Sequence, residues 1–183
     1  LISIVFTSNL DGVSNPVKEI TKISHQNGSL VLIDGAQAIG HQKIDVRDLD
    51  CDFFAFSGHK MLGPSGIGAI YIKKKLAEKL RPLIVGGGNV EDSTYESHKL
   101  LEAPSKFEAG LQDYAGIIGF GEAVKYLKNI GFENIKSQEG KLNRIISEGL
   151  KDLSQIKIIG PENPDQRSGI VNFYHQKMVS HEI

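Results

Sequence analysis

Short apolar runs alternate with amphipathic and polar segments along the first half of the chain. Four runs of five or six residues are rich in β-branched or aromatic side chains, which is typical of buried strands; they cover residues 2–7, 30–34, 53–57 and 67–72. Continuous apolar strands separated by crossover segments predict an α/β fold with a largely parallel sheet. Polar residues follow several of these strands directly, and the carboxyl ends of parallel strands are the usual binding edge of such a sheet.

The segment between the first two strands has the signals of a helix. Asn15 followed by Pro16 predicts a cap and a first helical residue, and Gly28 predicts the helix end. The expected buried stripe of this helix consists of Val17, Ile20, Ile23 and Ser24. His25 lies on the same helix, and we expect its side chain to be solvated.

The pattern of apolar runs ends before residue 86. Residues 86–106 show neither helical nor strand periodicity and predict a long loop, in which His98 is expected to be solvated. Two helices and two short, antiparallel-leaning strands follow, over residues 115–128, 132–151, 156–159 and 169–174. We expect a domain boundary near Gly131, which divides the chain into units 1–130 and 131–183.

The composition narrows the possible partners. The chain has 183 residues with 21 basic and 22 acidic groups and a net charge of −1, which argues against a nucleic-acid-binding surface. No apolar run approaches the roughly 18 residues that a membrane span needs, so a membrane is not an expected partner either. Cys51 is the single cysteine, which excludes an internal disulfide and makes the cytoplasm the expected location.

Glycine is unusually frequent and unevenly distributed. It accounts for 20 of the 183 residues, about 11% against a typical value near 7%. Thirteen of the 20 fall between Gly35 and Gly121. Since glycine weakens helices and strands, this excess predicts backbone placed where a Cβ would obstruct it.

The most informative residues lie at the ends of the second and third predicted strands. Asp34 ends the second strand, and Ser57, His59 and Lys60 stand at the end of the third, ahead of a turn rich in glycine and proline. Such a turn lets backbone approach a ligand, and hydroxyl and imidazole groups suit a phosphate. Pyridoxal 5'-phosphate (PLP) needs this combination: an amine for its aldehyde, a carboxylate for its ring nitrogen and donors for its phosphate.

Other interpretations of these residues fail on details. The phosphate loop of nucleotide hydrolases needs Gly-Lys followed by Ser or Thr, which residues 63–66 lack, and the spaced glycines of a dinucleotide site are not matched there. No metal site is expected, because the available ligands have no recognised spacing; these ligands are His41, Asp45, Cys51 and His59.

A family resemblance strengthens the PLP interpretation. Residues 52–68, Asp-Phe-Phe-Ala-Phe-Ser-Gly-His-Lys-Met-Leu-Gly-Pro-Ser-Gly-Ile-Gly, closely resemble the cofactor-lysine signature of class V aminotransferases, and most of all that of cysteine desulfurases and selenocysteine lyases. Further matches are Ser8-Asn9, Asn15-Pro16-Val17, Asp34-Gly35-Ala36-Gln37, Gly86-Gly87-Gly88 and Phe107-Glu108-Ala109-Gly110. The resemblance implies the later part of a PLP-binding large domain over 1–130 and the beginning of a small C-terminal domain over 131–183.

The resemblance also implies roles for individual residues. Lys60 would be the Schiff-base lysine and the base that removes the substrate α-proton, and Asp34 would pair with the pyridine nitrogen. Gln37 would hydrogen-bond the ring hydroxyl oxygen.

Three further residues complete the implied cofactor site. Ser57 and His59 would hold the phosphate. Asn9 would lie near the ring hydroxyl and the substrate carboxylate.

Two departures limit what this chain can do alone. Leu111 and Gln112 stand where many relatives carry a hydroxyl residue that reaches the phosphate of the partner subunit. Both ends of the chain look internal to a longer protein, so we expect the nucleophilic cysteine and the carboxylate-binding arginine of the family beyond Ile183. Cys51 is expected to be buried and inert, because an apolar site raises the pKa of a thiol.

The leading hypothesis is a PLP-dependent cysteine desulfurase, which converts L-cysteine to L-alanine and transfers the sulfur as an enzyme persulfide, and which is inactive as this chain alone. The alternatives are another class V enzyme (a selenocysteine lyase, a kynureninase-like hydrolase or an epimerase) or a non-catalytic fragment. The expected partners are a second subunit in a homodimer, cysteine or selenocysteine as substrate, and a protein sulfur acceptor such as one of iron–sulfur cluster assembly.

Overall fold

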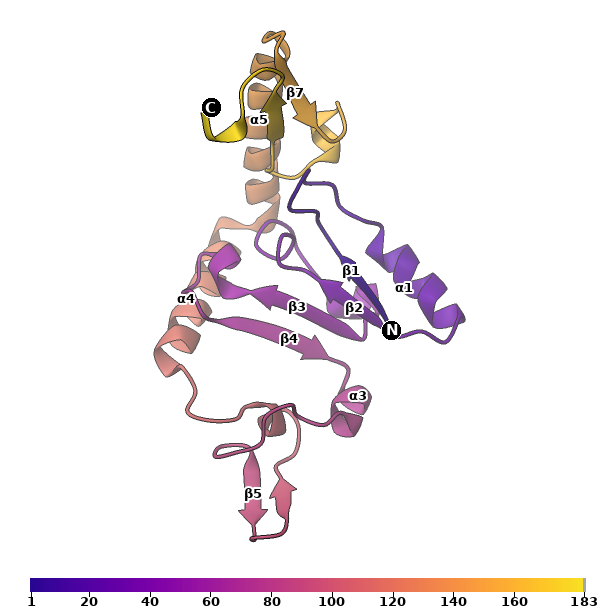
Figure 1. Ribbon diagram of the computed structural model, residues 1–183, viewed down its shortest axis with the longest axis vertical. Helices are drawn as coiled ribbons and strands as arrows, with labels where there is room; N and C mark the ends of the chain where they lie inside the picture. Colours follow the sequence, from indigo (N-terminus) through magenta and orange to yellow (C-terminus); the bar gives the residue numbers. More distant parts are fainter. Residues whose placement is uncertain (183) are drawn as a thin grey trace.

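A four-stranded sheet forms the centre of the molecule (Figure 1). The computed structural model describes residues 1–182. The strands are β1 (Ile2–Val5), β2 (Val31–Asp34), β3 (Phe53–Ser57) and β4 (Gly68–Ile72), in spatial order β1-β2-β3-β4. The pairs β1–β2 and β2–β3 are parallel, whereas β4 runs antiparallel to β3. The predicted α/β fold with a largely parallel sheet is confirmed.

Helices pack beside this sheet, and two separate two-stranded sheets lie at opposite ends of the molecule (Figure 1). The helices are α1 (Val17–Gln26), α2 (Val46–Leu49), α3 (Lys74–Lys79), α4 (Tyr114–Ile130) and α5 (Phe132–Lys151). The remaining strands are β5 (Val90–Ser93), β6 (His98–Leu100), β7 (Ile156–Ile159) and β8 (Asn172–His175). The two helices predicted in the second half therefore form where their periodicity places them.

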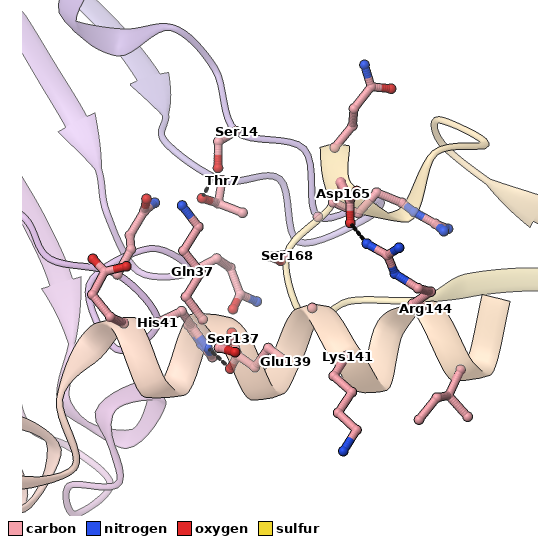
Figure 2. A pocket seen from close by; sticks show the side chains of 18 residues that line it. Thr7, Ser14, Gln37, His41, Ser137, Glu139, Lys141, Arg144, Asp165 and Ser168 are labelled. Atoms are coloured by element: carbon pink, nitrogen blue, oxygen red, sulfur yellow. Dashed lines mark hydrogen bonds and ion pairs between the residues drawn. The ribbon is translucent and has the colours of Figure 1, made fainter. Parts of the chain in front are cut away.

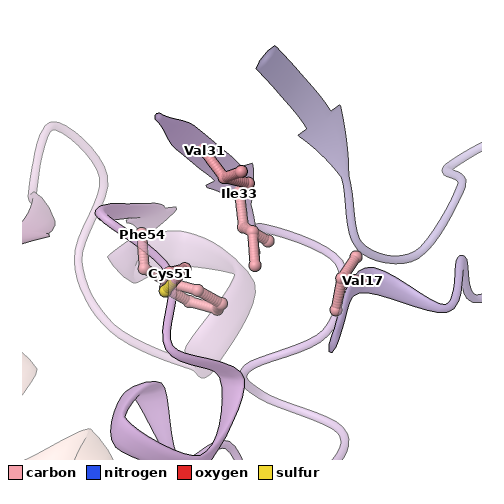
Figure 3. Close-up of a cluster of buried hydrophobic side chains, with 5 residues drawn as sticks. All are labelled: Val17, Val31, Ile33, Cys51 and Phe54. Carbon is pink, nitrogen blue, oxygen red and sulfur yellow. The ribbon is translucent and has the colours of Figure 1, made fainter. Parts of the chain in front are cut away.

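The hydrophobic core lies between the sheet and the segments that connect its first three strands (Figure 3). Its fully buried members come from α1, β2, β3 and the short segment between α2 and β3; they are Val17, Val31, Ile33, Cys51 and Phe54. Alternate residues of β2 point into this core because side chains of a strand alternate between its two faces. Cys51 is therefore packed as a small apolar side chain, as its surroundings in the sequence predict.

Helix α1 differs from its prediction in two respects. The side chain of Asn15 does not cap the helix; it donates a hydrogen bond from Nδ2 to the carbonyl of Val5, 2.8 Å away, and thereby ties the helix entry to β1. Ile23 is 58% exposed, and the buried face consists instead of Val17, Thr21 and Ser24. The two hydroxyl residues are buried without penalty because each donates to a carbonyl four residues earlier in the helix.

The predicted long loop over 86–106 contains a hairpin of β5 and β6. The strands are exposed and polar, so they carry no alternation that would reveal them. The fully buried Asn89 holds the base of this hairpin: its Oδ1 accepts from Gly86 N at 3.0 Å, and its Nδ2 donates to the carbonyls of Ile84 and Lys106. The three hydrogen bonds of this one amide tie residues 84, 86 and 106 together.

Beyond Gly131, α5 packs against β7, which pairs antiparallel with β8 (Figure 1); residues 131–182 are called the C-terminal unit below. Gly131, with φ of +86°, separates α4 from α5, which is where the domain boundary is predicted. A buried polar chain joins α5 to the segment before β8. Arg167 Nη2 donates to Ser147 Oγ at 2.7 Å, Ser147 Oγ donates to Asn143 Oδ1 at 3.0 Å, and Asn143 Nδ2 donates to the carbonyl of Ser168.

A charge cluster lies at the amino ends of β2 and β3. The buried Asp52 accepts hydrogen bonds through Oδ2 from Val31 N and from His25 Nε2, both at 2.8 Å, and its Oδ1 is 3.1 Å from Lys73 Nζ. The expectation that His25 is solvated was therefore wrong: the ring bridges α1 to the residue before β3. Nothing in the helical periodicity of α1 indicates a partner 27 residues away in the chain.

We expect replacement of Gly35 by alanine to destabilise the protein. A Cβ at Gly35 would overlap the ring of Phe54, which is fully buried and cannot give way. Overpacking of this kind costs about 1–3 kcal/mol, which urea-induced unfolding will show. The matched control is Gly121→Ala on α4, where a Cβ meets nothing within 4 Å and alanine should stabilise the helix by about 0.5–1 kcal/mol. Equal stability of the two variants would contradict this packing.

Asp52→Asn should reduce stability at neutral pH and flatten the loss of stability on acidification. Burial raises the pKa of Asp52, but the hydrogen bonds from His25, Val31 N and Lys73 outweigh it, so the pKa is lowered. A lowered pKa gives stability that is present above the ordinary carboxyl pKa and is lost as pH falls through the folded value. We expect a cost of about 1–3 kcal/mol at pH 7, measured by unfolding at several pH values. A variant as stable as the wild type at pH 7 would contradict the account.

Candidate functional site

Asp34 stands at the carboxyl end of β2, in the middle of the sheet edge. Its carboxylate is exposed, and Oδ1 accepts a hydrogen bond from Ala36 N at 3.0 Å, which orients the group locally. The backbone then leaves the sheet at Gly35, whose N–H donates to the carbonyl of Ala55 in β3. Because Gly35 lies against the Phe54 ring, the chain turns here at a fixed position.

The segment 35–42 after Asp34 folds into consecutive turns. Ala38 N and Ile39 N both donate to the carbonyl of Gly35, and His41 N donates to the carbonyl of Ala38. Gln37 is half-buried within the first of these turns. The sequence therefore places a carboxylate and an amide three residues apart on one compact segment.

The turn that carries Lys60 follows β3 directly. Ser57 ends the strand, and a 3₁₀ helix over Gly58–Met61 carries the exposed His59 and the half-buried Lys60. The turn is closed by backbone hydrogen bonds from Gly58 N to the carbonyl of Ile67 at 2.7 Å and from Gly63 N to the carbonyl of Gly58 at 2.9 Å.

Glycine is required in this turn because α4 packs against it. A Cβ at Gly63 would lie 2.9 Å from both the Gly58 carbonyl oxygen and the ring of Phe120 on α4. Gly68 meets a similar limit at the carbonyl of Phe56. These close approaches account for part of the glycine excess: the residues make room for neighbouring backbone and ring atoms, as the composition predicts.

The two segments meet at the carboxyl edge of the sheet. Asp34 pairs with Ala55 in the register of β2 and β3, so Asp34 and Ser57 end neighbouring parallel strands. Beyond the strands, Gly40 approaches the Lys60 turn so closely that a Cβ on it would be 2.6 Å from the Lys60 carbonyl oxygen. The structure thus brings the segments of Asp34, Gln37, Ser57, His59 and Lys60 together at one edge.

Asn9 lies at the same edge, after β1. It is exposed within a turn in which Ser8 N donates to the carbonyl of Val13 and Gly12 N donates to that of Ser8. Ser8 Oγ accepts from Leu10 N at 3.2 Å. The turn is therefore well ordered by its own hydrogen bonds, and it presents the Asn9 amide to solvent.

A cleft of about 860 Å³ opens beside this edge, between the sheet and α5 (Figure 2). Of the predicted site residues, Gln37 lines it. Its other lining side chains come from the turns after β1 and β2, from α5 and from the segment before β8; they include Thr7, Ser14, His41, Glu139, Arg144 and Asp165. Sequence reasoning missed Glu139, whose position in an amphipathic helix gives no hint of a partner across the cleft.

Cys51 lies at the opposite end of β3 from Lys60. It has no exposed surface, and burial raises the pKa of its thiol to about 11. A thiol with this pKa is almost entirely protonated at pH 7 and is a poor nucleophile. Among the described residues, no three His, Cys, Asp or Glu side chains are grouped so that they could hold a metal ion.

The donor set at the sheet edge fits PLP. It offers an amine on Lys60, a carboxylate on Asp34, and hydroxyl and imidazole groups on Ser57 and His59. Within residues 1–182, no ion pair engages the Lys60 ammonium group; the paired lysines are Lys18, Lys73, Lys99 and Lys125. The departure at Leu111 is visible as well, since its apolar side chain is 90% exposed and offers no donor.

The fold and this edge define a protein of the class V aminotransferase family, and the chain belongs to it: the family model described as Aminotransferase class-V matches residues 1–183. A probable cysteine desulfurase from Halalkalibacterium halodurans is 42% identical over 188 residues, and a cysteine desulfurase from Haloferax volcanii is 40% identical over 183. Each match covers 100% of this chain but only 44% and 43% of the relatives. The resemblance deduced from the sequence is confirmed.

Solved structures agree with the sequence relatives. The apo structure of a cysteine desulfurase from Thermococcus onnurineus NA1 superposes with a TM-score of 0.94 at 36% identity, over 98% of this chain and 45% of that one. The cysteine desulfurase CsdA from Escherichia coli gives 0.92 at 30% identity, over 98% and 44%. The chain thus spans less than half the length of these relatives. No helix among the described residues is long and apolar enough to cross a membrane.

Proposed function

We propose that these 183 residues are the cofactor-lysine part of a PLP-dependent cysteine desulfurase. The observation that carries the proposal is the edge of the sheet where the segments of Asp34 and Lys60 meet, in a chain whose relatives are named cysteine desulfurases. We assign residues 1–130 to the later part of the PLP-binding domain and 131–183 to the beginning of a smaller one. The overall reaction converts L-cysteine to L-alanine and leaves the sulfur on an enzyme cysteine as a persulfide.

PLP, when bound, supplies an electron sink that stabilises negative charge on the substrate α-carbon. The side chains of this chain would hold and tune it. Asp34, whose carboxylate is already oriented by Ala36 N, would keep the ring nitrogen protonated. Ser57 and His59 would bind the phosphate, because a hydroxyl and an imidazole at the start of a glycine-rich turn can both donate to phosphate oxygens.

Lys60 would hold the cofactor through its amine and later act as a base. Once the substrate amine has taken its place, the Lys60 Nζ atom would accept the substrate α-proton and return a proton to the product. Gln37 would donate to the ring hydroxyl oxygen, and Asn9 would contact that hydroxyl and the substrate carboxylate. The close packing of Gly40 on the Lys60 carbonyl would keep these groups in register.

The sulfur has no acceptor among the residues of this chain. Cys51 is its single cysteine and is buried, with a pKa raised to about 11. We therefore propose that the nucleophilic cysteine and the arginine that binds the substrate carboxylate belong to another part of the parent protein. The parent protein would be a homodimeric cytoplasmic enzyme that delivers sulfur to an acceptor protein, such as one used in iron–sulfur cluster assembly.

Lys60→Ala in the parent protein should abolish covalent PLP binding. Without this amine the absorption band of lysine-bound PLP should be absent, and formation of alanine from cysteine should fall by about 10²–10⁴-fold, the range for loss of a general acid–base group. The control is Lys75→Ala, an exposed lysine on α3, which should keep the band and the rate. A Lys60→Ala protein that retains the band would refute the assignment.

The isolated chain should not turn over cysteine. When purified residues 1–183 are mixed with PLP and cysteine, the alanine formed should not exceed that of a protein-free mixture of PLP and cysteine, because no reactive thiol is present. The parent protein serves as the positive control. The ratio of its rates with cysteine and with selenocysteine distinguishes a desulfurase from a selenocysteine lyase. Turnover of cysteine by the isolated chain would overturn this part of the proposal.

A further inference from the structure

An ion pair across the cleft joins α5 to the segment 35–42. His41 Nδ1 lies 2.6 Å from Glu139 Oε1, although the two residues are 98 positions apart in the chain. Their side chains are 35% and 25% exposed, so water screens the pair only partly. Figure 2 shows the pair where α5 passes the segment that carries Gln37.

His41 is mechanically linked to Gln37. The turn that begins at Gly35 includes Gln37 and ends on Ala38 and Ile39, and the next turn runs from the Ala38 carbonyl to the N–H groups of His41 and Gln42. Gln37 and His41 line the same cleft. A shift of the His41 side chain is therefore transmitted to Gln37 through a short segment that is ordered by hydrogen bonds.

The same segment contacts the Lys60 turn. Gly40, the residue before His41, has so little space that a Cβ would be 2.6 Å from the Lys60 carbonyl oxygen. Movement of the segment toward or away from α5 thus changes a contact with the backbone of Lys60. His41 therefore connects the C-terminal unit, through Glu139, to the segment that carries Gln37 and contacts the Lys60 turn.

The side chain of Glu139 packs against Gly169, in the segment before β8. A Cβ at Gly169 would lie 3.2 Å from both Cγ and Cδ of Glu139, so glycine leaves the space that this side chain occupies. The neighbouring Ser168 donates its N–H to the carbonyl of Gly12, at 2.8 Å, in the turn that carries Asn9. The C-terminal unit therefore supports the turns after β1 and β2 together.

The charge on His41 decides how strong this contact is. The hydrogen bond to Glu139 raises the pKa of His41, against a smaller opposing effect of burial. A raised pKa means that the attraction is fully present below the ordinary histidine value and is lost as pH rises through the folded value. The other charged groups that line the cleft are Glu133, Lys136, Lys141, Arg144, Asp165 and Arg167; of these, Arg144 and Asp165 pair with each other at 2.6 Å.

We propose that Glu139 is a positioning residue that acts through His41 to hold Gln37 and the Lys60 turn in their cofactor-binding arrangement. The inference rests on the proposed PLP function, and it adds a specific role for the C-terminal unit. Protonated His41 donates from Nδ1 to Glu139 and fixes the segment 35–42. Neutral His41 holds it more weakly, so the cofactor site loosens as the solution becomes more alkaline.

Glu139→Gln in the parent protein tests the inference with two measurements. In the cofactor-free protein, NMR should show a lowered His41 pKa and shifted signals of the Gln37 side-chain amide. With PLP, the dissociation constant should rise about fivefold, a modest coupling between sites, and its pH dependence near the His41 pKa should disappear. Glu133→Gln is the matched control, because Glu133 lies on the same helix and lines the same cleft, whereas the hydrogen-bond partner of the His41 ring is Glu139.

His41→Asn provides a second variant. Its amide can donate to Glu139 at any pH, so it should keep the Gln37 signals in their wild-type position while removing the pH dependence. Unchanged Gln37 signals in Glu139→Gln would overturn the positioning role. If PLP fails to attach to Lys60 in the wild type, the proposed function fails instead, and the Gln37 signals of the cofactor-free protein still decide whether Glu139 positions the segment.

Discussion

Gly35 packs against the ring of Phe54 so closely that even a methyl group would not fit, and this contact fixes how the chain leaves β2. Asp34 stands immediately before it and Gln37 shortly after it. Phe54 is fully buried, so its position is set by the whole core of Val17, Val31 and Ile33. The interior of the sheet thereby determines where a carboxylate and an amide are presented at its edge. Because an interior packed to this density has little free volume, the segment after β2 cannot shift without disturbing the core.

Much of the fold could be predicted because its elements are local. Continuous apolar runs identified all four strands of the sheet, and α5 forms over the predicted range. The carboxyl-edge grouping of Asp34 and Lys60 also followed from the order of strands. What the sequence does not display is pairing between distant polar residues. His25 meets Asp52, and His41 meets Glu139, through tertiary packing that no short pattern encodes.

The hairpin of β5 and β6 could not be predicted from the sequence either, for a different reason. Its strands are exposed and polar, so no hydrophobic pattern marks them, and the buried amide of Asn89 supplies the order instead. Ile23 was misplaced because an apolar residue at helical spacing is not always buried; hydroxyl groups of Thr21 and Ser24 take the buried face of α1 by bonding to the helix backbone. Burial of small polar groups is possible wherever their hydrogen bonds are satisfied locally.

The chemistry proposed for this chain depends on one amine. Treatment of the PLP-loaded parent protein with borohydride reduces the bond between the cofactor and its lysine to a stable secondary amine, and mass spectrometry of the digested protein then locates the modified residue. We predict that the cofactor is found on Lys60, on the peptide that also contains Ser57 and His59. Attachment to another lysine, or a protein that carries no reducible PLP after reconstitution, would contradict it.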